Sequence, residues 1–142
     1  MTKVIIWDDP TTKIMRVMAP AGGNTAEECV TKYLPDGITD YAIVEDSVLP
    51  ADRKFRNAWR KNGSNVKEDL TESKKLAHKT RRYERTKEFK PYDDIVMKQI
   101  PGSDTTTAES ERVKIRAKYA TMQTSIDNAS DVTAIRTALE VS

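Results

Sequence analysis

Residues 49–60 read LPADRKFRNAWR, and this stretch decides how we expect the chain to be organised. It follows a strand-like run and leads into a long basic segment. A proline and an aspartate near its start can open a short helix over residues 51–61. Phe55 and Trp59 are spaced i and i+4, so they share one face of that helix. Because each such ring buries about 150–250 Å², the stretch is predicted to be an anchor.

The residues before this anchor predict a small mixed unit. A β-branched run at residues 3–7 and an apolar run at 14–18 are typical of a β-hairpin. A helix is predicted over residues 26–33, because a threonine precedes it and two glutamates occupy its first turn. Residues 41–44 predict a third strand. Together these elements form a ββαβ unit that ends near Pro50.

The residues after the anchor predict helices. A long helix is expected over residues 68–89, and Pro91 is expected to end it. Helix 106–126 follows a polar linker, and Ser130 is expected to cap a final helix that packs back as a hairpin. The apolar positions of helix 106–126 are spaced 4, 3 and 4, as in a coiled-coil seam. These seam residues are Ile115, Tyr119, Met122 and Ile126.

The predicted fold class is therefore α+β, with a small N-terminal ββαβ unit followed by a long basic helix and a C-terminal helical hairpin. The ββαβ domain is placed at residues 1–50 and the connector anchored by Phe and Trp at 51–67. The long basic helix and its linker are placed at 68–102, and the hairpin at 103–142.

Composition limits the core and polarises the charge. The 142 residues are 37% hydrophobic and 32% charged, so the core is modest. The net charge of +2 hides a net −4 in residues 1–50, +8 in residues 51–92 and −2 in residues 93–142. This distribution indicates an electrostatic partner for the middle, or pairing between the ends and the middle. No apolar run approaches the roughly 18 residues of a membrane span, so no membrane partner is expected.

No catalytic, cofactor or metal site is predicted. One histidine and one cysteine cannot build a Cys/His zinc site. The pairs Asp8-Asp9 and Asp93-Asp94 lack EF-hand spacing, so we interpret them as turn and helix acids. His78 lies in a strongly positive segment and is expected to face solvent or a partner. The lone cysteine is expected to be a core thiol and favours synthesis in a reducing compartment.

Nucleic acid remains an alternative partner. The long helix carries a dense basic run at residues 74–90, with Tyr83 and Phe89 interleaved. Phosphate contacts from such a run give salt-dependent affinity without sequence preference. Three glutamates dilute its charge, however, and the basic residues surround the helix instead of following one stripe. A solvated or protein-contacting helix is the favoured interpretation.

The opening stretch also resembles a signature of small late-region proteins of tailed bacteriophages, Pro-x-Asp-Arg-x-Phe-Arg-x-Ala-Trp. Residues 49–59 carry it as LPADRKFRNAW. NTAEECVTKYLPDG at 24–37 and DYAIVEDSVLP at 40–50 are similar to the helix and strand that precede the signature. AHKTRRYER at 77–85 is similar to the basic helix that follows it. The likeness covers about residues 20–90.

This resemblance implies a phage setting near tail and tail-fibre genes, without an activity. We therefore expect a non-enzymatic structural component of the virion, made in the host cytoplasm and present in several copies. It would contact other phage structural proteins in the tail, baseplate or fibre-attachment region. Two alternatives are a tail-fibre assembly chaperone and a nucleic-acid-binding protein that uses helix 74–90.

The anchor has two possible roles that the sequence leaves open. Its arginines can fork onto carboxylates of the acidic first domain or of a neighbouring subunit. The aromatic residues can dock internally or form a subunit contact. The candidate interface residues along the whole chain are Arg53, Phe55, Arg56, Trp59, Arg81, Arg82, Tyr83, Arg85, Ile115, Tyr119, Met122 and Ile126.

Overall fold

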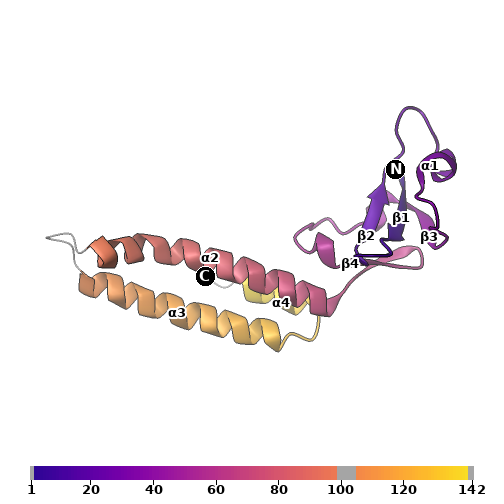
Figure 1. Ribbon diagram of the computed structural model, residues 1–142. Coiled ribbons are helices and arrows are strands. Elements are labelled where there is room, and N and C mark those ends of the chain that lie inside the picture. Colours follow the sequence, from indigo (N-terminus) through magenta and orange to yellow (C-terminus); the bar gives the residue numbers. More distant parts are fainter. Residues whose placement is uncertain (1, 99–104, 141–142) are drawn as a thin grey trace. The chain divides into compact units, whose positions relative to one another are not determined.

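The structure is a computed structural model that describes residues 2–98 and 105–140. The chain divides into two compact units, Met1–Glu72 and Ser73–Ser142 (Figure 1). The described strands lie in the first unit together with the helix at Ala26–Tyr33, and the second unit is helical. The predicted α+β class is therefore confirmed. The predicted connector at 51–67 lies inside the first unit. The predicted boundary between residues 102 and 103 lies outside the described residues.

The first unit contains a three-stranded antiparallel sheet. Its strands are β1 (Lys3–Asp8), β2 (Met15–Met18) and β3 (Tyr41–Glu45), in the order β2-β1-β3. Helix α1 (Ala26–Tyr33) lies between β2 and β3 in sequence and begins with a capping box, as the threonine and glutamate signals indicate. The short 3₁₀ turn η1 (Asp46–Val48) follows β3. The predicted ββαβ unit is thus present.

Strand β1 is buried on both faces, which creates two clusters of apolar side chains. Ile5 and Trp7 pack with Ala26 and Cys29 of α1, so the expected core thiol is confirmed. The alternate residues on β1 point to the opposite face, since side chains alternate along a strand. That second cluster consists of Val4, Ile6, Met15, Val44 and Trp59.

The predicted helix over residues 51–61 is wrong. The chain makes only the short 3₁₀ turn η2 (Arg56–Ala58) and then a hairpin of β4 (Trp59–Asn62) and β5 (Asn65–Glu68). Gly63 has a φ of +61° in the two-residue loop, a conformation that glycine adopts readily. A two-residue Gly-Ser loop is a hairpin signal, and here Gly63-Ser64 between the paired Asn62 and Asn65 takes precedence over the i, i+4 aromatic spacing.

The second unit consists of α2 (Leu70–Lys98), α3 (Thr105–Asp127) and α4 (Val132–Leu139). Figure 1 shows α3 alongside α2, and α4 packs on α3 as the predicted hairpin requires. The predicted seam of α3 is buried, with exposures between 0% and 7%.

Two predicted helix boundaries in this unit are wrong. Pro91 does not end α2, which continues to Lys98. Proline removes one backbone hydrogen bond, but α2 is tied to α3 on both sides of Pro91, through Glu88 and Asp93. The cap of α4 is Asp131, whose carboxylate accepts a bond of 2.7 Å from a backbone N–H in the first turn, instead of Ser130.

Candidate anion-binding cleft

One end of the α2–α3 pair is fixed by polar contacts to Asp127, the last residue of α3. The Nζ of Lys74 donates to the Asp127 carbonyl at 2.9 Å, and His78 Nε2 lies 2.7 Å from the Asp127 carboxylate. Arg81 Nε donates to His78 Nδ1 at 3.3 Å. Since Nδ1 accepts, Nε2 carries the proton that His78 donates to Asp127. The expectation that His78 faces solvent or a partner is therefore wrong, because the ring links the two helices.

A second tie joins Glu88 of α2 to α3. Lys118 Nζ donates to the Glu88 carboxylate at 2.6 Å, and the Tyr119 hydroxyl also donates to it. The bond from Lys118 lowers the pKa of Glu88, burial opposes this, and the bond from Tyr119 lowers it further. Burial raises the pKa of Tyr119, and the neighbouring Glu88 carboxylate adds to that shift.

This second tie predicts acid-dependent stability of the helical unit. The folded pKa of Glu88 lies below its ordinary value of 4.5, so its contribution is present above pH 4.5 and is lost as pH falls through the folded pKa. The side chain is 37% exposed, so we expect Glu88→Gln to cost less than about 1 kcal/mol near pH 6.

Urea unfolding of both proteins between about pH 3 and pH 6 checks this sign. The two curves should converge at the acid end. A control is Glu84→Gln, which removes an exposed carboxylate from a looser pair with Lys87 at 3.7 Å. A Glu88→Gln deficit that stays constant over this pH range would contradict the assignment.

Four arginines line a cleft of about 310 Å³ between α2 and α3. Arg81, Arg82 and Arg85 come from α2, and Arg116 comes from α3. The positions on α2 are spaced i, i+1 and i+4, so one side of that helix supplies all three. The remaining lining residues, all on α3, are Tyr119, Ala120 and Gln123.

These four guanidinium groups have no anionic partner within residues 2–98 and 105–140. None of them forms an ion pair with a described carboxylate. The nearby acids are used by lysines, since Glu84 pairs with Lys87 and Glu88 with Lys118. The charge of Asp127 acts on Arg81 without forming an ion pair, so the positive charge of the cleft is compensated only in part.

The guanidinium groups are held in place by contacts outside the cleft. The Cζ of Arg85 lies 4.8 Å, and that of Arg116 lies 6.0 Å, from the centre of the Phe89 ring. Both distances fit cation–π interactions. Phe89 is only 9% exposed, so it offers a fixed support to one arginine from each helix.

The electrostatics of the cleft favour a negative ligand. Burial lowers the pKa of Arg81, and the charges of Arg82 and Arg85 lower it further. The nearby Asp127 carboxylate opposes these two effects in part. A bound anion would likewise favour the charged form of Arg81.

The residues of the anchor belong to the first unit, whereas the cleft belongs to the second. The side chains of Phe55 and Trp59 are 0% exposed. Both rings are therefore docked inside the protein and do not form a subunit contact. The Cζ of Arg53 lies 5.6 Å from the centre of the Trp59 ring, and Arg56 is exposed. A buried ring leaves no surface for a partner, so of the four candidate interface residues in this segment only Arg53 and Arg56 are accessible.

The other candidate interface residues lie in the second unit. Arg81, Arg82 and Arg85 meet in the cleft, whereas Tyr83 is 63% exposed beside Lys87. Tyr119 is buried and contributes to the wall of the cleft. The other seam residues, Ile115, Met122 and Ile126, are buried within the unit.

Sequence reasoning missed three residues of the cleft. Arg116, Ala120 and Gln123 lie on α3 with spacings of four and three, which places them on one helical side. This spacing of residues 116, 120 and 123 is visible in the sequence, but the apolar seam of helix 106–126 alone does not point to it. Recognising the cleft also requires the pairing of α2 with α3, which no local pattern predicts.

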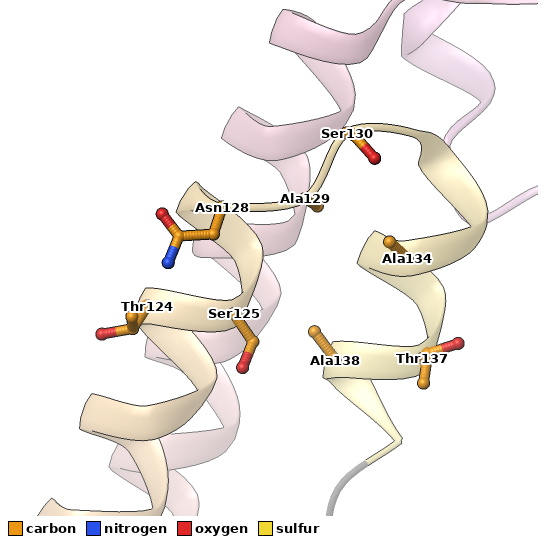
Figure 2. A pocket seen from close by; sticks show the side chains of 8 residues that line it. All are labelled: Thr124, Ser125, Asn128, Ala129, Ser130, Ala134, Thr137 and Ala138. Atoms are coloured by element: carbon orange, nitrogen blue, oxygen red, sulfur yellow. The ribbon is translucent and has the colours of Figure 1, made fainter.

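A second hollow of about 630 Å³ lies between α3 and α4. Figure 2 shows Ser125 of α3 and Ala138 of α4 directed toward the space between these helices. The lining residues are uncharged, namely Thr124, Ser125, Asn128, Ala129, Ser130, Ala134, Thr137 and Ala138. Without a charged or titratable group, this hollow offers no specific binding chemistry.

The acidic pairs considered for metal have other partners. Asp9 accepts bonds from the backbone of Thr11 and Thr12, which lower its pKa, and Asp8 accepts from the backbone of Lys61. Asp93 lies 3.0 Å from Arg112, and Asp94 lies 3.4 Å from Lys90. In the described part of the chain, no three His, Cys, Asp or Glu side chains are grouped to hold a metal ion.

Among the described helices, none has both the length and the apolar content that a membrane span needs. No protein-family model, curated protein or solved structure matches this chain.

Proposed function

We propose that this chain is a non-enzymatic structural component of a tailed bacteriophage particle, in its tail, baseplate or fibre-attachment region. Its contacts would be with other phage structural proteins. The phage setting is supported by the signature-like residues 49–59. The structural role is carried by one observation, which is that only Ser73, Ala77 and Phe89 are buried along the 29 residues of α2.

A helix with so little buried surface gains little from packing within its own chain. Most helical stability in proteins comes from packing of an apolar face, and a largely polar helix commonly bridges to other surfaces. Large apolar side chains also remain exposed in the second unit, with Tyr83 at 63%, Met97 at 83% and Val113 at 58%. Neighbouring subunits that cover these side chains would complete the packing.

Mass spectrometry of purified virions tests this proposal. We expect the chain to copurify with infectious particles in a fixed ratio to the other tail proteins. The matched sample is the infected-cell lysate, in which the chain must also be detected. If the chain is abundant in the lysate but missing from purified virions, the assembly-chaperone alternative replaces the structural role.

Nucleic acid binding is a second candidate function, and the four arginines of the cleft, which form no ion pair with a described carboxylate, favour it. Phosphate contacts release counterions, so the affinity for DNA should fall steeply as salt rises. A titration of the full chain with duplex DNA at several salt concentrations measures this slope. Absence of binding at low salt would remove this candidate.

A further inference from the structure

We propose that the arginine cleft on α2 and α3 is a binding site for a compact oxyanion of the phosphate class that carries at least two negative charges. Pyrophosphate and a terminal phosphate monoester belong to this class. The site goes beyond the proposed structural role and does not depend on it, since it lies wholly within the second unit.

The charge of the cleft selects this class of ligand. Four guanidinium groups share a volume of about 310 Å³, and no described carboxylate pairs with them. A single carboxylate or phosphodiester would offset one of these charges. A phosphate monoester carries nearly two charges near neutral pH, and pyrophosphate carries more within a similar space. Arginine also matches such ligands geometrically, because its planar fork bonds two oxygens at once.

The cleft is organised before any ligand binds. Phe89 supports Arg85 and Arg116 through its ring. Arg81 uses its Nε to donate to His78, which is itself tied to Asp127. This bond leaves the terminal N–H groups of Arg81 for a ligand. Preorganisation of this kind lowers the entropic cost of binding.

The surroundings favour a compact ligand over an extended nucleic-acid backbone. Two lysines near the cleft are paired with acids, Lys87 with Glu84 and Lys118 with Glu88, while Lys79 on α2 is exposed. On α3, Lys114 also pairs with Glu111 at 3.0 Å. Positive charge is therefore concentrated in the cleft instead of following a continuous track, which a polymer of phosphodiesters would require.

Two lining residues on α3 suit a small oxyanion. Ala120 has the shortest side chain in the lining, so it leaves space between the arginines. Gln123 contributes a side-chain amide whose two N–H groups can donate to a phosphate oxygen. A bulky residue at position 120 would fill the same space while leaving every charge in place.

Calorimetric titration of the full chain with inorganic pyrophosphate at about 0.1 M ionic strength, where exposed charges more than about 10 Å apart are screened, tests the proposal. We expect saturable binding at one site per chain. Arg116→Gln should weaken binding about tenfold or more, the effect of losing one charge-assisted bond. Ala120→Leu should weaken it at least as much without changing the net charge.

Matched controls are available on the same helices. Lys79→Gln removes an exposed charge from α2, and Ala117→Leu adds an exposed side chain to α3. Neither residue lines the cleft, so both variants should bind pyrophosphate within about twofold of the wild type, as expected for screened surface charges. Circular dichroism establishes that each variant is folded before titration, and Arg82→Gln serves as a second cleft variant.

Further titrations distinguish two sources of the phosphate group, namely the end of a nucleotide chain and a free anion. A short single-stranded oligonucleotide is tested with and without a 5′-phosphate. Stronger binding of the phosphorylated form supports a nucleotide end as the ligand, while binding of inorganic pyrophosphate alone supports a free anion. Both outcomes support the proposal, and both are measured without reference to the virion.

Three outcomes would overturn it. The first is the absence of saturable binding by the wild type at about 0.1 M ionic strength. The second is equal affinity in Arg116→Gln, Ala120→Leu and the controls, which would show a diffuse surface effect. The third is tighter binding of hexaglutamate, or of duplex DNA without terminal phosphates, than of pyrophosphate, which would assign the cleft to protein carboxylates or to phosphodiesters.

Discussion

Trp59→Ala is expected to lower the free energy of unfolding of the first unit by about 3–5 kcal/mol, the usual cost of removing a large buried aromatic side chain. Trp59 is 0% exposed and is the largest of the fully buried side chains. It packs from β4 against Val4 and Ile6 of β1 and against Met15 of β2. Its loss would remove the main apolar contact between the β4–β5 hairpin and the sheet.

The expected loss is large relative to the stability of so small a unit. Single domains are stable by only about 5–15 kcal/mol, so we expect Trp59→Ala to unfold a large fraction of the first unit. Hydrogen exchange, measured by mass spectrometry on peptides from each unit, reports the two units separately. Protection should fall across β1, β2 and β4 and should persist in α3.

Trp59→Phe provides a matched control. The indole Nε1 has no hydrogen-bond partner among the described residues, so replacing the indole by a benzene ring removes no hydrogen bond. Most of the apolar contact remains, and the loss should be clearly smaller than for alanine. A similar loss for both variants, or a loss below about 1 kcal/mol for alanine, a value typical of minor substitutions, would contradict the role of Trp59 as anchor.

The first unit shows which signals in the sequence were sufficient to predict its strands and its helix. Alternating apolar residues and a capping box are local signals, and they predicted the sheet and α1 correctly. The hairpin of β4 and β5 was missed because Phe55 and Trp59 are spaced i and i+4. That spacing fits a helix face, but it also fits a buried ring just before a turn and a buried ring at the start of a strand. The Gly-Ser pair at 63–64, which forms the loop, was the better signal.

The second unit shows what local patterns cannot supply. The seam of α3 was predicted from its periodicity alone. The continuation of α2 past Pro91 depends on ties to α3 from Glu88 and Asp93, whose partners lie 30 and 19 residues away in sequence, at Lys118 and Arg112. The arginine cleft likewise needs both helices, so only three of its four arginines could be named in advance.

Phe89→Ala is expected to have the second large effect, because Phe89 is the one large apolar side chain that α2 buries. A loss of about 3–5 kcal/mol is typical for phenylalanine to alanine in a core, and it should appear as reduced protection of α2 and α3. The ring also supports Arg85 and Arg116 at 4.8 and 6.0 Å. The variant should therefore lose affinity for pyrophosphate as well as stability.

Phe89→Leu separates these two effects. Leucine keeps most of the apolar volume, so the cost in stability should be much smaller than for alanine. It lacks the aromatic face, and each cation–π contact contributes about 0.5–1 kcal/mol or more. We therefore expect a folded protein whose pyrophosphate affinity is reduced several-fold, measured by the same titration as the cleft variants. If Phe89→Leu binds pyrophosphate as tightly as the wild type, the ring only fills the core, and the arginines must be positioned by their own helices.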